Sequence, residues 1–174
     1  LSPGLYLLYC TGSNKQVRTG VIDMKRSRGF EFIREYRDCG LKLPVRSTHN
    51  SAGYDIAAAR NVCLKPGKMV VIPTGIKAYM LPDEYLAIHI RSSLGVKHGL
   101  YLVNSQGIID SDYYDNPDNE GHIMIAMGNR GTSDFVIDIG MRIAQGIFGK
   151  YLLTDQDQFA KKESRGGGIG STGS

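Results

Sequence analysis

Short apolar runs, separated by turns that contain glycine or proline, recur along this chain. Of its 174 residues, 22 are glycine and six are proline, and they are spread among these runs. This pattern is typical of an all-β barrel or sandwich with many tight turns, and it is poorly suited to long helices. Because 174 residues with 41% hydrophobic content can bury one sizeable core, we expect a single all-β domain.

Segments in which apolar and polar residues alternate mark the expected strands, because a period of two is the pattern of a half-buried strand. The segments 74–80 and 85–90 flank Leu81-Pro82-Asp83-Glu84 and have the rhythm of a hairpin. One short helix, or a turn, is expected at 92–97. No internal repeat is evident, which argues against a solenoid or a propeller. The expected strands lie within 30–33, 61–72 (interrupted by a turn at Lys65-Pro66-Gly67), 74–80, 85–90, 99–103, 121–128, 133–137 and 144–151.

The two ends of the chain differ in composition from its centre. The apolar run 5–10 is shorter than the hydrophobic region of a signal peptide and lacks a positively charged lead, and no stretch reaches membrane-spanning length. Met24, followed by Lys25-Arg26-Ser27-Arg28, has the context of a native start. We therefore expect a leader or an added extension at 1–23, the folded domain at 24–160 and a flexible glycine-rich arm at 161–174.

The charge and the cysteines of the chain limit the classes of function that it could have. Its 17 acidic residues are interspersed with 21 basic ones, and no basic stripe or series of stacking aromatic residues appears, so a phosphorylated small molecule is a better partner than a nucleic acid polymer or a membrane. Cys10, Cys39 and Cys63 form no CxxC pair, which argues against a disulfide framework or a thiolate metal site and favours the reducing cytoplasm. The four histidines have no metal-binding spacing.

Five short segments, three of which contain glycine, interrupt or follow the expected strands. Taken singly, each has an ordinary explanation, since glycine beside aspartate is usually a turn, arginine beside serine is usually a solvated surface and a glycine-rich tail is usually a linker. The five segments are Ser-Ala-Gly-Tyr-Asp at 51–55, Arg-Ser-Ser at 91–93, Gly-Ile-Ile-Asp-Ser-Asp-Tyr at 107–113, Arg-Ile-Ala-Gln at 142–145 and Arg-Gly-Gly-Gly-Ile-Gly-Ser-Thr-Gly at 165–173.

In this order and spacing, the five segments resemble the motifs of the trimeric dUTPase family from about residue 43 to residue 173. The resemblance implies a jelly-roll-like β-barrel of the dUTPase type, assembled as a homotrimer with exchange of the C-terminal arm. It also implies an enzyme that splits dUTP into dUMP and pyrophosphate, which limits uracil in DNA and supplies dUMP for dTMP synthesis. Its location would be the cytoplasm, or the host-cell cytoplasm if the gene is viral.

The expected reaction makes specific demands on the site. Hydrolysis at the α-phosphorus needs a water in line with the leaving pyrophosphate, a base, and positive charge around the triphosphate. The resemblance implies that Asp110 is the catalytic base, although an aspartate there could simply cap a turn. Arginines suit phosphate oxygens, and Mg²⁺ prefers oxygen ligands and retained waters. The phosphates would bind Mg²⁺ directly, and Asp55 would orient its water shell.

Base and sugar recognition are expected in a β-hairpin between Asn104 and Tyr113, whose backbone would present a base-pairing edge to uracil. The resemblance implies that the Tyr113 ring lies under the deoxyribose and excludes a 2′-hydroxyl, whereas the ordinary alternative is a buried core tyrosine. The expected substrate-binding residues are Arg91, Ser92, Ser93, Asn104, Gly107, Ile108, Ile109, Tyr113, Met124, Gln145, Arg165, Gly168, Ile169, Gly170 and Ser171.

Two features depart from the family pattern. The segment 114–120 is longer than the turn that most members have there, and it could form a surface lobe, contact a protein partner through 115–120, or have no function, which is the interpretation we favour. Ile169 stands where the family usually has a phenylalanine that closes over uracil. The contribution of stacking by the arm is therefore an open question.

Two other functions compete with the hydrolase. The dCTP deaminases share the fold and parts of the Arg-Ser-Ser and hairpin motifs, but they use a glutamate in the strand after the hairpin. Here that strand reads His-Ile-Met-Ile-Ala-Met at 122–127 and has no glutamate. The second alternative is a regulatory protein on the same scaffold, in which the nucleotide is a signal and the longer segment contacts another protein.

Overall fold

The computed structural model describes residues 6–7, 20–21 and 26–157 of the chain. The described elements are almost all strands, with one α-helix and two short 3₁₀ helices, so the all-β expectation is confirmed. None of the helices described here is long and apolar enough to cross a membrane. The strands are β1 (Tyr6–Leu7), β2 (Gly20–Val21), β3 (Gly29–Phe32), β4 (Val45–Arg46), β5 (Tyr54–Ala57), β6 (Val62–Leu64), β7 (Met69–Pro73), β8 (Ile76–Tyr79), β9 (Glu84–Ile90), β10 (Leu100–Leu102), β11 (Gly107–Asp110), β12 (Met124–Asn129), β13 (Phe135–Ile137) and β14 (Arg142–Lys150), and the helices are η1 (Arg34–Tyr36), α1 (Ser92–His98) and η2 (Ser111–Tyr113).

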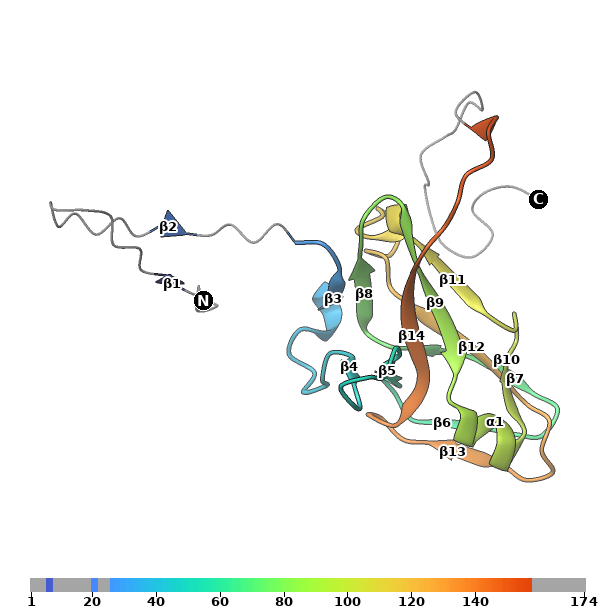
Figure 1. Cartoon of the computed structure of the whole chain (residues 1–174). Coiled ribbons are helices and arrows are strands. Elements are labelled where there is room, and N and C mark those ends of the chain that lie inside the picture. The colour runs from blue at the N-terminus through green and yellow to red at the C-terminus, as the bar shows by residue number, and fades with distance from the viewer. Residues whose placement is uncertain (1–5, 8–19, 22–25, 158–174) are drawn as a thin grey trace, which may run out of the picture.

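The strands form a jelly-roll-like barrel of antiparallel sheets (Figure 1). The largest sheet has five strands in the order β11-β9-β14-β5-β4, and a second sheet has the order β10-β12-β7. Two-stranded pairs, β13-β6 and β3-β8, complete the barrel, and β1 pairs with β2. Spatial neighbours are rarely neighbours in sequence, so most of the pairing is non-local.

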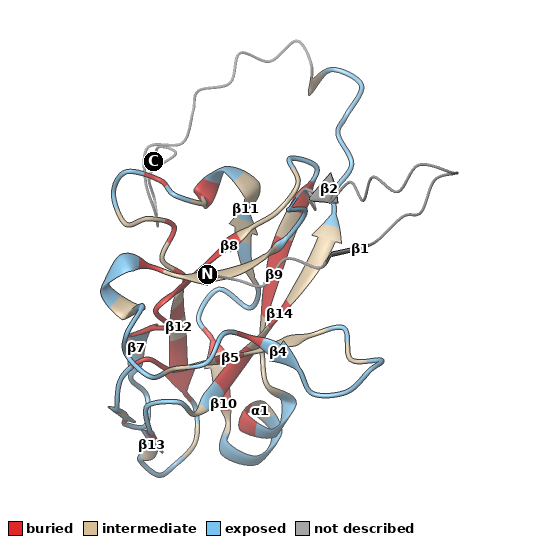
Figure 2. Ribbon diagram, turned by 90° about the vertical axis from the view of Figure 1, so that its left-hand side faces the viewer, coloured by how far each residue is buried: buried red, intermediate tan, exposed pale blue. Residues whose placement is uncertain are grey.

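The core lies between the sheets and consists of aliphatic side chains (Figure 2). On β9, Leu86 and Ile88 are 0% and 2% exposed, while the alternate residues Tyr85 and His89 are partly exposed. Because successive side chains of a strand point to opposite faces, this alternation assigns the inner and outer faces of the five-stranded sheet. Further buried residues on other strands are Ile56, Leu64, Ile72, Met127, Ile137 and Ile143, and Ile123 is buried just before β12.

Most expected strands are present, but two expected hairpins are wrong. The segments 74–80 and 85–90 do not pair, because β8 pairs with β3 while β9 lies between β11 and β14. The hairpin expected between residues 104 and 113 is absent from the described chain as well, since β10 pairs with β12 and β11 pairs with β9. In both cases a strand pairs with a partner that is distant in sequence and not with its sequence neighbour.

The helix expected at 92–97 is confirmed as α1, which ends at Gly99 in the left-handed conformation (φ 67°). The two strands β4 and β5 were not expected. β5 carries part of the first glycine-bearing segment, and its four residues are too few for alternation to stand out from the surrounding turns.

Candidate functional site

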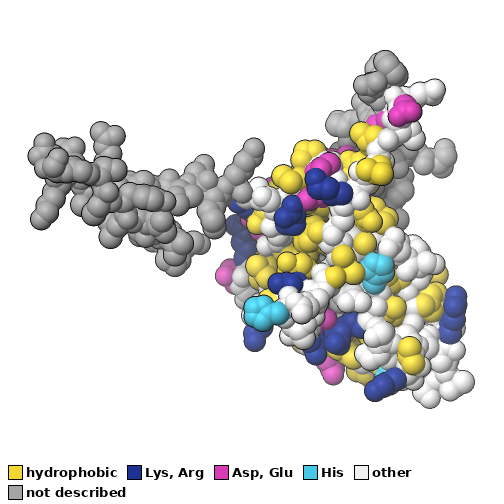
Figure 3. All heavy atoms as spheres, in the orientation of Figure 1, with side chains coloured by type: hydrophobic (Ala, Val, Ile, Leu, Met, Phe, Trp, Pro, Cys, Tyr) yellow, Lys and Arg dark blue, Asp and Glu magenta, His cyan; other side chains and the backbone are white. Residues whose placement is uncertain are grey.

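The outer face of the five-stranded sheet carries three of the expected site residues. The strand register places Asp55, Gln145 and His89 in one row across β5, β14 and β9. A second row, across β14, β9 and β11, contains Gly149, Tyr85 and Asp110. Strands β9 and β14 cross the front of the molecule in Figure 1, and Figure 3 shows hydrophobic side chains mixed with basic and histidine side chains on that face.

Asp55 is the centre of a charged cluster, which we call the Asp55 cluster and which comprises Ser47, Asp55, Arg91 and Arg142. Oδ1 of Asp55 lies 3.2 Å from Nε of Arg91. Oδ2 accepts hydrogen bonds from Nη1 of Arg142 at 2.9 Å and from the Ser47 hydroxyl at 2.7 Å. The Asp55 side chain is only 12% exposed. One largely buried carboxylate therefore holds two guanidinium groups in fixed positions at the surface.

The charge state of Asp55 follows from this arrangement. Burial alone would raise the pKa of its carboxyl. The hydrogen bonds from Ser47 and Arg142 and the nearby charge of Arg91 outweigh burial and hold the pKa below its ordinary value. Asp55 is therefore ionised at neutral pH.

The neighbouring polar residues are placed by the backbone. Arg91 ends the extended run of β9 and serves as the N-cap residue of α1, so Ser92 and Ser93 form the first turn of that helix beside the Asp55 cluster. Gln145 is paired with Asp55 across the sheet, and its side chain packs over the backbone of Gly53. A Cβ atom at position 53 would collide with the Gln145 amide, which explains why glycine stands there.

Asp110 lies at the end of β11, on the edge of the sheet, in a surface pocket of about 460 Å³. The pocket is lined by Tyr85, Ile108, Asp110, Lys150 and Tyr151. Lys150 is engaged by Asp83, with its Nζ 2.5 Å from a carboxylate oxygen. Asp110 and Lys150 are exposed, and Ile108 is 48% exposed. The candidate base therefore faces a cavity that is large enough for a ligand and open on one side.

The turn between β10 and β11 carries the residues expected to bind the base. It is closed by a hydrogen bond from the Ser105 amide to the Leu102 carbonyl at 3.0 Å. Asn104 directs its side-chain amide toward Gly107, and Nε2 of Gln106 lies 3.2 Å from Nε2 of His89. Of the two isoleucines that follow, Ile108 faces outward and Ile109 packs partly against the core.

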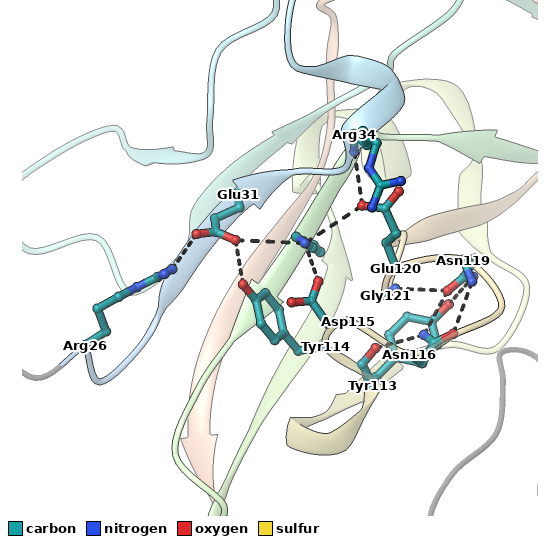
Figure 4. A network of polar contacts seen from close by, with 11 residues as sticks. Arg26, Glu31, Arg34, Tyr113, Tyr114, Asp115, Asn116, Asn119, Glu120 and Gly121 are labelled. Carbon is teal, nitrogen blue, oxygen red and sulfur yellow. Dashed lines mark hydrogen bonds and ion pairs between the residues drawn. The ribbon is translucent and has the colours of Figure 1, made fainter. Parts of the chain in front are cut away.

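Tyr113 ends η2 and is 8% exposed. Its hydroxyl donates to the His122 carbonyl at 3.1 Å. The same hydroxyl accepts from Nδ2 of Asn119 at 2.8 Å, and Asn119 lies beside Tyr113 in Figure 4. The tyrosine is thus bonded at its hydroxyl, and the alternative of a buried tyrosine describes its surroundings well. Met124 begins β12 opposite Pro73 and is partly exposed.

A family model for dUTPase matches residues 40–173, a range that contains all five motif segments. The chain belongs to the dUTPase family. The resemblance carried by the motifs is therefore confirmed, and so is the assignment to an enzyme family of nucleotide hydrolases.

Individual dUTPases are similar to the chain over most of their length. The deoxyuridine 5′-triphosphate nucleotidohydrolase of Lactococcus lactis is 51% identical over 146 residues, which are 84% of this chain and 97% of that protein. The Rickettsia felis protein of the same name is 43% identical over 147 residues, with 81% and 95% covered. The crystal structure of the dUTPase from Streptococcus mutans has a TM-score of 0.69 and 47% identity, and the match covers 73% of this chain and 98% of that one.

Within this one dUTPase chain, the expected site residues form two separate groups. Asp110 stands three strands across the sheet from Asp55, and their rows are four residues apart along β14. With strands about 4.8 Å apart and about 3.3 Å of rise per residue, the two Cα atoms are roughly 20 Å apart. The candidate base and the Asp55 cluster are thus not brought together by the fold of a single chain.

Asp55 has two partners that the sequence reasoning did not single out, Ser47 and Arg142. Arg142 belongs to the same segment as Gln145, and an arginine beside a phosphate-binding motif was a usable signal. Ser47 lies before the first motif, and nothing in the sequence marks it as a partner of Asp55. The remaining expected contacts, Arg165, Gly168, Ile169, Gly170 and Ser171, lie outside the described residues.

Proposed function

We propose that this dUTPase-family chain hydrolyses dUTP to dUMP and pyrophosphate, in active sites that subunits of a homotrimer share. The names of the Lactococcus and Rickettsia relatives support dUTP as the substrate. The observation that carries the proposal is the family match over residues 40–173, in a fold that gathers Asp55, Arg91 and Gln145 on one face.

Asp110 is the proposed general base. Its carboxylate would accept a proton from a water that attacks the α-phosphorus as pyrophosphate leaves on the opposite side. The open pocket around Asp110 and Ile108 supports this role, because substrate and water can both reach it.

The triphosphate is proposed to bind at the Asp55 cluster. Arg91 would offer charge-assisted hydrogen bonds, and Ser92, Ser93 and Gln145 would add neutral donors. Asp55 and Arg142 support this by holding the Arg91 side chain in one orientation before substrate arrives. From the arm, Arg165 would complete the clamp on the phosphates, with Gly168, Ile169, Gly170 and Ser171 covering the nucleotide.

Magnesium is proposed as the cofactor, and the donor set fits an ion that enters with the substrate. In the described part of the chain, no group of three or more His, Cys, Asp or Glu side chains could hold a metal by itself. Both oxygens of Asp55 are already engaged by guanidinium or hydroxyl groups, which suits a contact through water better than direct ligation. Bound to the phosphate oxygens, the ion would neutralise part of their charge.

Uracil is proposed to bind the backbone of residues 107–109, with Asn104 and Met124 beside it and the Tyr113 ring against the deoxyribose. The rigid fixing of Tyr113 supports discrimination against a 2′-hydroxyl, since a ring that cannot move aside leaves no room for it. Such an enzyme would limit uracil in DNA and supply dUMP for dTMP synthesis. The described cysteines, Cys39 and Cys63, are free thiols, in agreement with the cytoplasmic location that we propose.

The shared site is supported by the separation of the two groups. A gap of roughly 20 Å between Asp110 and Asp55 exceeds what their side chains can span around one α-phosphorus. Asp110 of one subunit would therefore act with the Asp55 cluster of another subunit. Ile108, 48% exposed beside the pocket, gives a second subunit an apolar contact. Light scattering should give the mass of three chains, and a fully active monomer would reject this arrangement.

Pyrophosphate release from dUTP, dTTP, dCTP and UTP tests the proposed function. We expect release from dUTP alone, with no ammonia released from dCTP. Deamination of dCTP would favour the deaminase alternative instead. The strand β12 supports the hydrolase, since none of its residues from Met124 to Asn129 is a glutamate.

A further inference from the structure

The segment 114–120, which follows η2, is bonded to other parts of the protein (Figure 4). The Tyr114 hydroxyl donates to Glu31 at 2.5 Å, and Glu120 accepts from the backbone amide of Arg34 at 3.2 Å. Lys77, whose side chain is 6% exposed, donates to Asp115. Burial and the bond to Glu31 raise the pKa of Tyr114 to about 12, so its hydroxyl remains a donor. These contacts hold the segment in a defined position on the body of the protein.

The backbone of the segment is held in conformations that side chains rarely adopt. Asp115 and Glu120 have φ values of 54° and 59°, and they are two of the three non-glycine residues with positive φ among those described. Such conformations cost energy and persist only where the surroundings enforce them. The bond from the buried Lys77 holds Asp115 at one end of the segment, and the bond from the Arg34 amide holds Glu120 at the other end.

The segment forms hydrogen bonds to Tyr113, the residue that precedes it. Nδ2 of Asn116 donates to the Tyr113 carbonyl at 2.8 Å, and Nδ2 of Asn119 donates to the Tyr113 hydroxyl at 2.8 Å. Oδ1 of Asn119 accepts from Nδ2 of Asn116 at 2.8 Å and from the Gly121 amide at 3.0 Å. The two asparagines thus bind each other and both ends of the same tyrosine.

The packing leaves Tyr113 little freedom to shift. A Cβ atom on Gly121 would lie 2.6 Å from the Tyr113 carbonyl oxygen, so the loop backbone already touches that carbonyl. Asn116 is 5% exposed, and a buried amide that lost its partners would carry the full cost of desolvation. A movement of the Tyr113 ring would break several of these bonds together.

We infer that Asn119, supported by Asn116, is a positioning residue that fixes the Tyr113 ring and thereby sets the discrimination between deoxyribose and ribose. This inference rests on the proposed function, in which the ring lies against the sugar. A ring that is free to retreat would admit a 2′-hydroxyl, whereas a ring bound at its hydroxyl and at its carbonyl would not. The longer segment is then a specificity element.

Asn119→Asp tests the inference, because aspartate keeps the acceptor for Asn116 and Gly121 but removes the donor to the Tyr113 hydroxyl. We expect the ratio of kcat/KM for dUTP to kcat/KM for UTP to fall about fivefold or more, as the loss of one buried hydrogen bond implies. Asp118→Asn, a one-charge change at the exposed neighbouring residue, is the matched control and should leave that ratio unchanged. A purely structural role would lower both activities together, so an unchanged ratio in Asn119→Asp overturns the inference.

Tyr113→Phe provides a second test of the inference, because it removes the hydroxyl that Asn119 binds. If Asn119 acts through that hydroxyl, Asn119→Asp should change the ratio no further in the Tyr113→Phe background, whereas a full additional effect would overturn the inference. An NMR measurement of Tyr113 ring flipping separates the two proposals. If the wild-type chain fails to hydrolyse dUTP, the proposed function is wrong, and faster ring flipping in Asn119→Asp than in Asp118→Asn still decides whether Asn119 holds the ring.

Discussion

The Asp55 cluster and the Asp110 pocket occupy the same face of one sheet but are built in opposite ways. In the Asp55 cluster, a carboxylate that is 12% exposed is satisfied by two arginines and a serine of the same chain. Asp110 instead lies exposed on the edge strand β11, in an open pocket. The cluster is ordered by contacts within one chain, whereas in the proposed function the pocket becomes a site when groups of other subunits are brought to it. Substitution of Asp110 should therefore lower turnover alone, whereas substitution of Asp55 should lower both stability and activity.

The largest effect is expected at the pocket. Asp110→Asn keeps the size of the side chain and removes the base, so turnover of dUTP should fall roughly a hundredfold or more. Binding of dUTP, measured by calorimetry, should stay within a few-fold of wild type, and thermal stability should be unchanged. Asp138→Asn, on an exposed residue after β13, is the matched control. Near-normal turnover in Asp110→Asn would remove this residue from the mechanism.

At the Asp55 cluster, we expect an effect on both stability and activity. Because the folded pKa of Asp55 lies below the ordinary value of 3.8, its contribution to stability is fully present above that value and is lost as the pH falls through the folded pKa. Asp55→Asn should therefore lower the free energy of unfolding at pH 7 by roughly 1 kcal/mol and flatten its decline below pH ~4.

Denaturant unfolding between pH 2.5 and 7 measures this difference, with Asp138→Asn again as the control. The same substitution should weaken dUTP binding, since Arg91 and Arg142 lose the carboxylate that orients them. If the free energy of unfolding of Asp55→Asn has the same pH dependence as that of wild type, then the ionised Asp55 carboxylate does not stabilise the fold.

The smallest effect is expected in the arm, at position 169. Stacking of a base on an aromatic ring is worth on the order of 1 to 3 kcal/mol, and isoleucine offers contact area without a π-face. Ile169→Phe should therefore lower the KM for dUTP several-fold, while Ile169→Leu should leave it unchanged. If the phenylalanine variant has the wild-type kcat/KM, then stacking at this position contributes nothing.

The sequence predicts local features of this fold better than its pairings. Alternation located β9, and the short helix expected at 92–97 is present as α1, because such signals lie within a few residues of one another. Neither expected hairpin formed, since the partner of β8 is β3 and that of β11 is β9. Strand pairing across a barrel depends on the whole topology, which no short window contains.

The same limit applies to the site. The motifs identified Asp55, Arg91 and Gln145, but the contact of Ser47 with Asp55 depends on how β4 lies beside β5. The asparagines around Tyr113 sit in a segment that sequence reasoning set aside, because their function lies in hydrogen bonds back to the preceding residues. The composition of that segment does not distinguish a loop that binds Tyr113 from a loop that is simply solvated.

The central claim, that Asp110 and Arg91 act in one site from different subunits, is tested most directly by mixing two inactive variants. Asp110→Asn and Arg91→Ala chains, unfolded together and refolded at equal concentrations, should regain about a quarter of wild-type dUTP turnover, because a quarter of randomly assembled sites pair an intact Asp110 with an intact Arg91. Each variant refolded alone gives the baseline. Activity of the mixture that stays at this baseline, in trimers shown by mass to contain both chains, would contradict the shared site.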